Sequence, residues 1–144
     1  MSRVKIRFPD EKPLIEVVIP LRITDMNYGN HLGNDKVLTL FHEARITALD
    51  QLGFSELDIG EGVSLIMADV MIRFRSEGFF GDDTFIQIWI GDFSKSSFQM
   101  YYKLMAKEKD QNRVIAEGKT GMVCFDYSQR TIQEVPEVFR AAVS

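Results

Sequence analysis

The stretch that decides the fold spans residues 25–52 and reads DMNYGNHLGNDKVLTLFHEARITALDQL. Its first ten residues are mostly polar and include two glycines, a composition typical of a loop. The rest carries apolar residues at helical spacing, which predicts one long helix over residues 35–52. Asn34 suits the N-cap position of this helix, and Gly53 suits the position just beyond its C-terminus.

One face of the predicted helix is apolar and the opposite face is polar. Arg45 falls inside the apolar face, so its charge requires a partner or a route to the surface. We expect Asp25 to be that partner. The apolar face, read at about 100° per residue, consists of Val37, Leu38, Phe41, Ala44, Ala48, Leu49 and Leu52.

Segments with a two-residue period flank the helix. Residues 14–22 are rich in Val and Ile but contain Pro20, which favours an edge strand. Short connections separate the later segments and favour antiparallel pairing, because parallel strands need long crossovers. The sequence thus predicts an α+β domain with an antiparallel sheet of about five strands over one long helix. The later segments are residues 63–75, 84–91, 98–106 and 115–125.

The second face of this sheet carries more apolar material than a solvated face normally does. Trp89 and Tyr101 lie on it, together with several Ile and Phe residues. We interpret this face as covered by a second subunit.

Composition excludes several classes of protein. The chain has 144 residues, which is the size of a single domain covering 1–144. A net charge of −4 argues against a nucleic-acid binder, which needs a basic surface. No apolar run is long enough to span a membrane, and residues 1–10 do not resemble a signal peptide, so we expect a cytoplasmic protein. Cys124 is the only cysteine, and we expect it in the core.

The loop before the helix is the stretch that can carry chemistry. It places Asp25, Asn27, His31 and Asn34 just ahead of a helix N-terminus, where backbone N–H groups are free and the helix dipole is positive. Such a site stabilises a carbonyl oxygen that becomes negative during acyl transfer. Gly33 lets a ligand approach the backbone closely. The alternative is that these residues only form the turn and the helix cap.

The same residues match a family pattern. Residues 30–38 (NHLGNDKVL) and 43–45 (EAR) resemble the Gly-His-Val-Asn-Asn-x-x-Tyr-Leu … Glu-Ala-Arg signature of hotdog-fold acyl thioesterases. The nearest groups are the 4-hydroxybenzoyl-CoA thioesterase-like proteins and the plant acyl-ACP thioesterases. The resemblance spans nearly the whole chain in order, and continues through residues 72–75, 80–82, 96–98, 118–120, 125–126 and Pro136.

The resemblance implies a hotdog fold, in which an antiparallel sheet wraps round a central helix. It also implies a homodimer with two active sites at the subunit interface, often paired again into a homotetramer. The implied activity is hydrolysis of an acyl-CoA or acyl-ACP to a free acid and a thiol. No metal or other cofactor is expected.

Site residues carry over position by position. In many family members the loop reads Asp-x-Asp-x-x-Gly-His, and its second Asp is the catalytic carboxylate. Here that position is Asn27, whose amide cannot act as a base but can donate a hydrogen bond. The catalytic His of the plant-type enzymes matches His31 and their catalytic Glu matches Glu77, whereas Gly29 replaces their catalytic Asn.

We therefore expect backbone N–H groups near Gly33 and Asn34 to polarise the thioester carbonyl, with Tyr28 as a further substrate-binding residue. Asn27 would position the carbonyl or the attacking water. Glu77 would activate that water, directly or together with His31.

Asp25 and Glu43 are the further candidates for the catalytic base. Two other functions stay open at this point. One is a hotdog dehydratase acting on 3-hydroxyacyl thioesters, and the other is a hotdog protein that binds acyl thioesters without catalysis.

Overall fold

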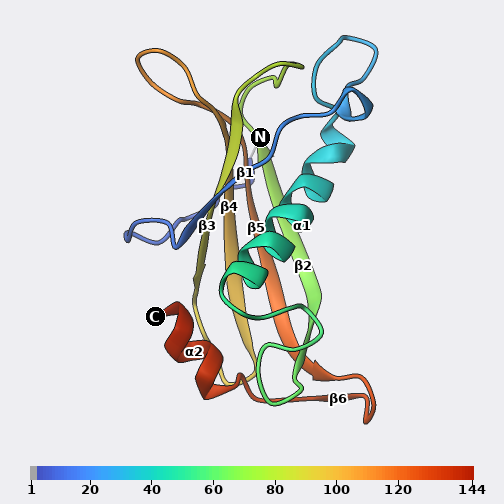
Figure 1. The fold of residues 1–144 in the computed structure, drawn as a ribbon, viewed down its shortest axis with the longest axis vertical. Helices are drawn as coiled ribbons and strands as arrows, with labels where there is room; N and C mark the ends of the chain where they lie inside the picture. The colour runs from blue at the N-terminus through green and yellow to red at the C-terminus, as the bar shows by residue number, and fades with distance from the viewer. Residues whose placement is uncertain (1–2) are drawn as a thin grey trace.

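The computed structural model describes residues 3–144, which form one curved sheet, a long helix and a short C-terminal helix (Figure 1). The expected helix and four later strands lie within two residues of the sequence-based boundaries. The 3₁₀ turn, β6 and α2 were not predicted. The elements are β1 (Ile15–Val18), η1 (Ile23–Asp25), α1 (Asn34–Gln51), β2 (Ser64–Phe74), β3 (Thr84–Gly91), β4 (Ser97–Ala106), β5 (Arg113–Asp126), β6 (Thr131–Ile132) and α2 (Glu137–Val143).

The sheet has the strand order β1-β3-β4-β5-β2, and every neighbouring pair is antiparallel. β6 adds a short sixth strand beside the end of β5. β1 is shorter than expected, because Pro20 has no N–H to continue the ladder. β1 and β2 are the two edges of the main sheet. The expected antiparallel sheet over one long helix is confirmed.

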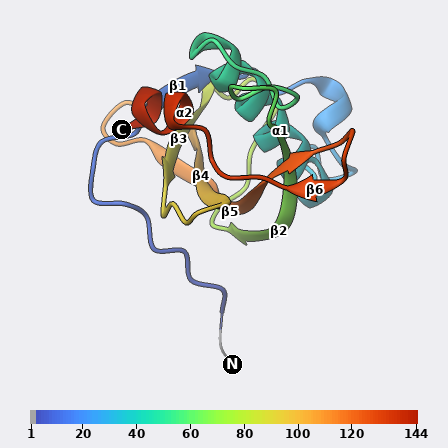
Figure 2. The same cartoon turned by 90° about the horizontal axis from the view of Figure 1, so that it is seen from below.

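α1 lies in the concave side of the curved sheet (Figure 2). Leu40 is buried and Leu38 only half-buried, so the helix is rotated slightly from the expected orientation. The N-cap is Gly33 rather than Asn34, which is already the first helical residue. Gly53 ends the helix in the left-handed region (φ 87°), as expected for a residue just beyond the C-terminus.

Phe41 anchors α1 in the sheet. Its ring stacks on Tyr102 of β4 with the ring centroids 4.8 Å apart. On β5, Gly118 provides the space for the same ring, since a Cβ there would lie 2.3 Å from Phe41 Cε2. The helix can approach the sheet this closely only because residue 118 has no side chain.

α2 closes the end of the core opposite the loop. Its buried Phe139 packs edge-on against Phe54 from the segment after α1. The same ring lies 5.0 Å from Phe98 of β4, centroid to centroid. α2 therefore covers aromatic side chains that α1 is too short to reach.

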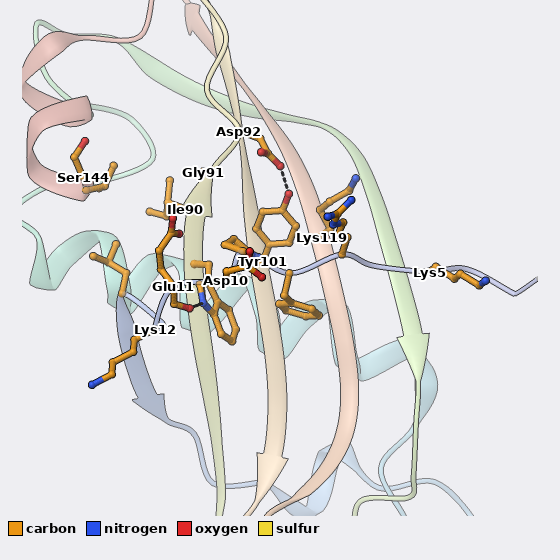
Figure 3. Close-up of a pocket in the computed structure, with 16 residues that line it drawn as sticks. Lys5, Asp10, Glu11, Lys12, Ile90, Gly91, Asp92, Tyr101, Lys119 and Ser144 are labelled. Carbon is orange, nitrogen blue, oxygen red and sulfur yellow. Dashed lines mark hydrogen bonds between the residues drawn. The ribbon is translucent and has the colours of Figure 1, made fainter.

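The chain's own N-terminal arm, residues 3–14, crosses the convex face of the sheet and packs on its aromatic side chains (Figure 3). Phe8 packs edge-on against Trp89 (5.0 Å between centroids) and near Tyr101 (5.8 Å). The Trp89 indole N–H donates a hydrogen bond to the Glu11 carbonyl (2.9 Å). The expectation that a second subunit covers these two aromatic residues is therefore wrong, because the arm buries them within one chain.

Two further expectations concern single features. Cys124 is buried in the core as expected, and burial raises the pKa of its thiol to about 11. Within residues 3–144, no helix is both long and apolar enough to cross a membrane.

We predict that Gly118→Ala destabilises the fold by about 1–3 kcal/mol, because the added methyl displaces the Phe41 ring from a packed core. Urea unfolding measures the change. Gly91→Ala on β3 is the control, since a Cβ at that position meets no atom within 4 Å. Equal losses in both variants would show that helix packing does not depend on this contact.

Candidate active site

Asp25 holds together the loop that precedes α1. Its buried carboxylate accepts hydrogen bonds from the Arg22 backbone N–H (2.8 Å) and from the Arg22 guanidinium (3.2 Å). Its carbonyl oxygen accepts one from the Gly33 N–H (3.0 Å). The expected ion pair between Asp25 and Arg45 is therefore wrong, because Arg22 occupies this carboxylate. The Gly33 N–H, which we expected to polarise a substrate carbonyl, is occupied by the loop itself.

Asn27, Gly29 and His31 form the outer turn of the loop. Asn27 Oδ1 accepts a hydrogen bond from the Gly29 N–H (2.9 Å), and the Asn27 N–H donates to the His31 carbonyl (2.9 Å). Asn30 adopts the left-handed region (φ 61°), which asparagine tolerates better than most residues. The imidazole lies against Gly29, since a Cβ there would be 2.6 Å from His31 Nε2. Gly29 thus makes room for the histidine.

Three of the expected site residues, His31, Asn34 and Glu77, line one cleft of about 360 Å³ at the start of α1, called the helix-start cleft below. The loop, the first turn of α1 and the segment after β2 supply these side chains. The Leu32 N–H donates to the Gly78 carbonyl (2.6 Å) and joins the loop to that segment.

The first turn of α1 has free N–H groups beside this cleft. Among residues 3–144, neither the Asn34 N–H nor the Asp35 N–H has an acceptor within hydrogen-bond distance. The N-cap, Gly33, has no side chain that could accept from them. Asn34 also lines the cleft, so a free donor lies at the positive end of the α1 dipole.

Glu77 has a fixed backbone and a free carboxylate. Its carbonyl accepts a hydrogen bond from the Arg113 guanidinium, which also pairs with Asp82 (2.9 Å) and Glu108 (3.0 Å). The Glu77 side chain is exposed, and its carboxylate has no ion-pair partner within the described part of the chain. It is therefore available to a water molecule in the cleft.

The other expected site residues do not line this cleft. Tyr28 is fully exposed at the tip of the loop, and Asn27 is exposed beside it. Glu43 lies on the solvent side of α1 near Arg22, whose pKa is raised mainly by the hydrogen bond that its guanidinium donates to Asp25 and slightly by the Glu43 charge.

A second cavity of about 440 Å³ lies further along α1, between this helix and β2, and is called the α1–β2 cavity below. The side chains of Leu38, Leu65 and Met67 form apolar parts of its wall. Arg45 and Glu56 supply charge. Sequence reasoning missed Glu56, which lies in the irregular segment after α1 and belongs to no motif.

Arg45 is buried, and two of its nitrogens are engaged by partners on two sides. Its Nε donates to Glu56 Oε1 (2.5 Å) and its Nη1 to the Tyr102 hydroxyl (3.1 Å), which also bonds to Thr120 Oγ1 (2.7 Å). Burial works against the charge of Arg45, but these partners outweigh it and raise its pKa. Burial likewise raises the pKa of Tyr102, so its hydroxyl stays neutral.

A cavity of about 900 Å³, larger than the two described above, lies under the N-terminal arm on the opposite face of the sheet (Figure 3). Charges of both signs line it, including Lys5, Lys119 and Glu11. Tyr101 donates a hydrogen bond to Asp92, and burial together with this bond raises the pKa of Tyr101. None of the expected site residues reaches this cavity, so its size does not make it the active site.

Comparison with known proteins identifies the family of the chain. Residues 21–143 match the family model described as the thioesterase-like superfamily. No protein with a curated description matches the chain.

Solved structures share the fold at low sequence identity. A 1,4-dihydroxy-2-naphthoyl-CoA thioesterase from Synechocystis is 21% identical, with a TM-score of 0.77 over 89% of this chain and 93% of that one. A gentisyl-coenzyme A thioesterase is 19% identical, with a TM-score of 0.76 over 90% of this chain and 100% of that one. A thioesterase-superfamily protein from Jannaschia is 19% identical, with a TM-score of 0.77 over 89% of this chain and 79% of that one. The chain therefore belongs to the thioesterase-like superfamily and has the hotdog fold.

Proposed function

We propose that this protein hydrolyses acyl thioesters to a free acid and a thiol in the helix-start cleft. One observation carries the proposal: the cleft combines a free Asn34 N–H, the His31 imidazole and the unpaired Glu77 carboxylate. A donor for the carbonyl oxygen and a base for the attacking water are the two groups that thioester hydrolysis requires.

In the proposed reaction the thioester carbonyl oxygen lies at the start of α1 and accepts hydrogen bonds from the Asn34 and Asp35 N–H groups. The Glu77 carboxylate takes a proton from water while the water oxygen attacks the carbonyl carbon, and His31 orients that water. Charge collects on the carbonyl oxygen, where the helix dipole stabilises it. The oxyanion then collapses, the C–S bond breaks, and the leaving sulfur takes the proton from Glu77.

Asn27 has a positioning role in this proposal. Its Oδ1 is held by the Gly29 N–H, and its own N–H holds the His31 carbonyl. The side chain therefore shapes the turn that carries the imidazole and does not itself line the cleft.

The thiol carrier is CoA or acyl carrier protein. Two proteins of the same fold are named as CoA thioesterases, which favours CoA. A thiol-release assay with matched acyl-CoA and acyl-ACP substrates distinguishes the two carriers.

We also propose that two copies of the chain pair through β2. This strand has no neighbour on its outer edge within residues 3–144, and Met67, Val70 and Phe74 expose about 40–50% of their surface there. Val70 pairs with buried Thr120, so it lies on the same side of the sheet as α1 without being covered by it. An open apolar edge strand is a surface that favours strand addition.

A two-fold axis at the middle of the exposed part of β2 would place Met67 of one copy opposite Phe74 of the other. Phe74 lines the helix-start cleft and Met67 lines the α1–β2 cavity. The cleft of one copy would then adjoin the cavity of the second copy, which gives two composite sites per dimer. Pairing of two dimers into a tetramer stays an expectation from the family resemblance.

We expect Glu77→Gln to lower kcat for acyl-CoA hydrolysis by about 10²-fold or more, because an amide cannot take a proton from water. Thiol release over a panel of acyl-CoAs measures this, with Glu134→Gln, an exposed surface change, as control. If Glu77→Gln stays near the wild-type rate while Glu43→Gln does not, the base is on α1 instead. Tight binding without any turnover in the wild type would point to a binding protein.

Gly29→Ala should reduce kcat by about tenfold or more with little change in stability, because the new methyl displaces the imidazole of a surface loop. His31→Ala should give a similar loss, and the double variant should lose little beyond either single change. Additive losses would show that Gly29 and His31 act independently.

Val70→Asp should convert the dimer to a monomer, because it would place one carboxylate of each copy close to the two-fold axis on an otherwise apolar edge. Sedimentation equilibrium measures the mass. The matched control is Val18→Asp on the opposite edge strand β1, where the valine is 67% exposed. A dimer that survives Val70→Asp but not Val18→Asp would place the interface on β1.

A further inference from the structure

The α1–β2 cavity is lined in part by the buried side chain of Arg45, which has one hydrogen-bond donor that no described residue engages. The Arg45 side chain is 6% exposed, and its Nε and Nη1 are engaged by Glu56 and Tyr102. Its Nη2 has no acceptor within residues 3–144, yet it is not enclosed by protein atoms. Arg45 is one of the residues that line the cavity, which is the open space beside this otherwise buried side chain.

Glu56 supplies a complementary acceptor beside that donor. Its Oε1 accepts from Arg45, whereas its Oε2 lies 3.6 Å from His42 Nε2, beyond ordinary hydrogen-bond length. A guanidinium N–H with no acceptor and a carboxylate oxygen whose only neighbour of opposite character is the more distant His42 imidazole therefore belong to residues that line the same cavity, as His42 also does. Their charges compensate each other, so the site as a whole offers one donor and one acceptor without net charge.

Apolar side chains form much of the remaining cavity wall, which also includes Thr39, His42 and Tyr127. Leu38 of α1, Leu65 and Met67 of β2, and Met122 of β5 line it. Methionine side chains adapt to ligands of different shape. Apolar walls with a few convergent polar groups are the usual architecture of a small-molecule site.

We propose that the α1–β2 cavity binds the acyl group of the substrate, and that Arg45 and Glu56 select acyl groups with a hydroxyl at the end remote from the thioester. The inference rests on the proposed function for the nature of the ligand. A hydroxyl accepts from Arg45 Nη2 and donates to Glu56 Oε2 at once. A methyl group leaves both partners unpaired, and a carboxylate is repelled by Glu56.

The direct test uses non-hydrolysable S-alkyl-CoA thioethers that end in methyl, hydroxyl or carboxylate, matched in length over a series of chain lengths. Calorimetry should show the hydroxyl-ended probe binding the wild-type protein about tenfold more tightly than the methyl-ended one, with the carboxylate-ended probe weakest. Equal affinities for the three ends at every length, or no binding of any probe, would overturn the proposal.

Glu56→Gln provides a sharper test, because it removes the negative charge and keeps an oxygen for Arg45. Affinity for the carboxylate-ended probe should rise by about tenfold or more, while affinity for the methyl-ended probe should stay unchanged. Glu134→Gln, the same substitution on an exposed ion pair with Lys95, should leave all three affinities as in the wild type. An unchanged carboxylate affinity in Glu56→Gln would contradict the assignment.

The same probes separate this proposal from the proposed function. One outcome is that the probes bind in the expected order of affinity (hydroxyl end tightest, then methyl, then carboxylate) while the corresponding thioesters are not hydrolysed. That result would refute the proposed hydrolysis and leave the proposed acyl site in place. Hydrolysis of thioesters with no preference among the three ends would refute the acyl site alone. Arg45→Met should abolish the preference in protein shown to be folded by circular dichroism.

Discussion

The contact between Phe41 and Gly118 is the one on which the rest of the structure depends. A helix in the concave side of a curved sheet must come close to the strands to exclude water, and a side chain at position 118 would prevent this. Once the Phe41 ring lies on Tyr102, the orientation of α1 is fixed. The N-terminus of the helix then lies against the segment after β2, and Arg45 lies under the Tyr102 hydroxyl.

The loop before α1 satisfies most of its own hydrogen bonds. Asp25 engages the Gly33 N–H, and Asn27 engages the outer turn. These bonds tie the two ends of the loop together, and the first N–H groups of α1, at Asn34 and Asp35, have no acceptors in the described chain. A few free backbone N–H donors in a fixed place at a helix start bind a carbonyl oxygen more selectively than many free N–H donors in a loop would.

Charge is distributed unevenly along α1. The helix start carries a free donor beside an exposed carboxylate, whereas the middle of the helix buries Arg45 with Glu56. Burying this pair is costly unless its groups find partners, and the one Arg45 donor without a described acceptor, Nη2, is not enclosed by protein atoms. The fold thus keeps a charged pair at the wall of a cavity, where the free donor can bond to water or to a bound hydroxyl.

The sequence by itself determined the long helix, the four later strands and the loop at the helix start, because each has a clear period or a strong turn composition. The sequence was also sufficient to recognise the family, since the residues of the loop and helix motifs are contiguous in the chain. Only the tertiary structure decided which groups pair: Glu56 rather than Asp25 neutralises Arg45, and the N-terminal arm rather than a second subunit covers Trp89. Pairings between distant segments depend on the closure of the sheet round α1, which no local pattern of residues records.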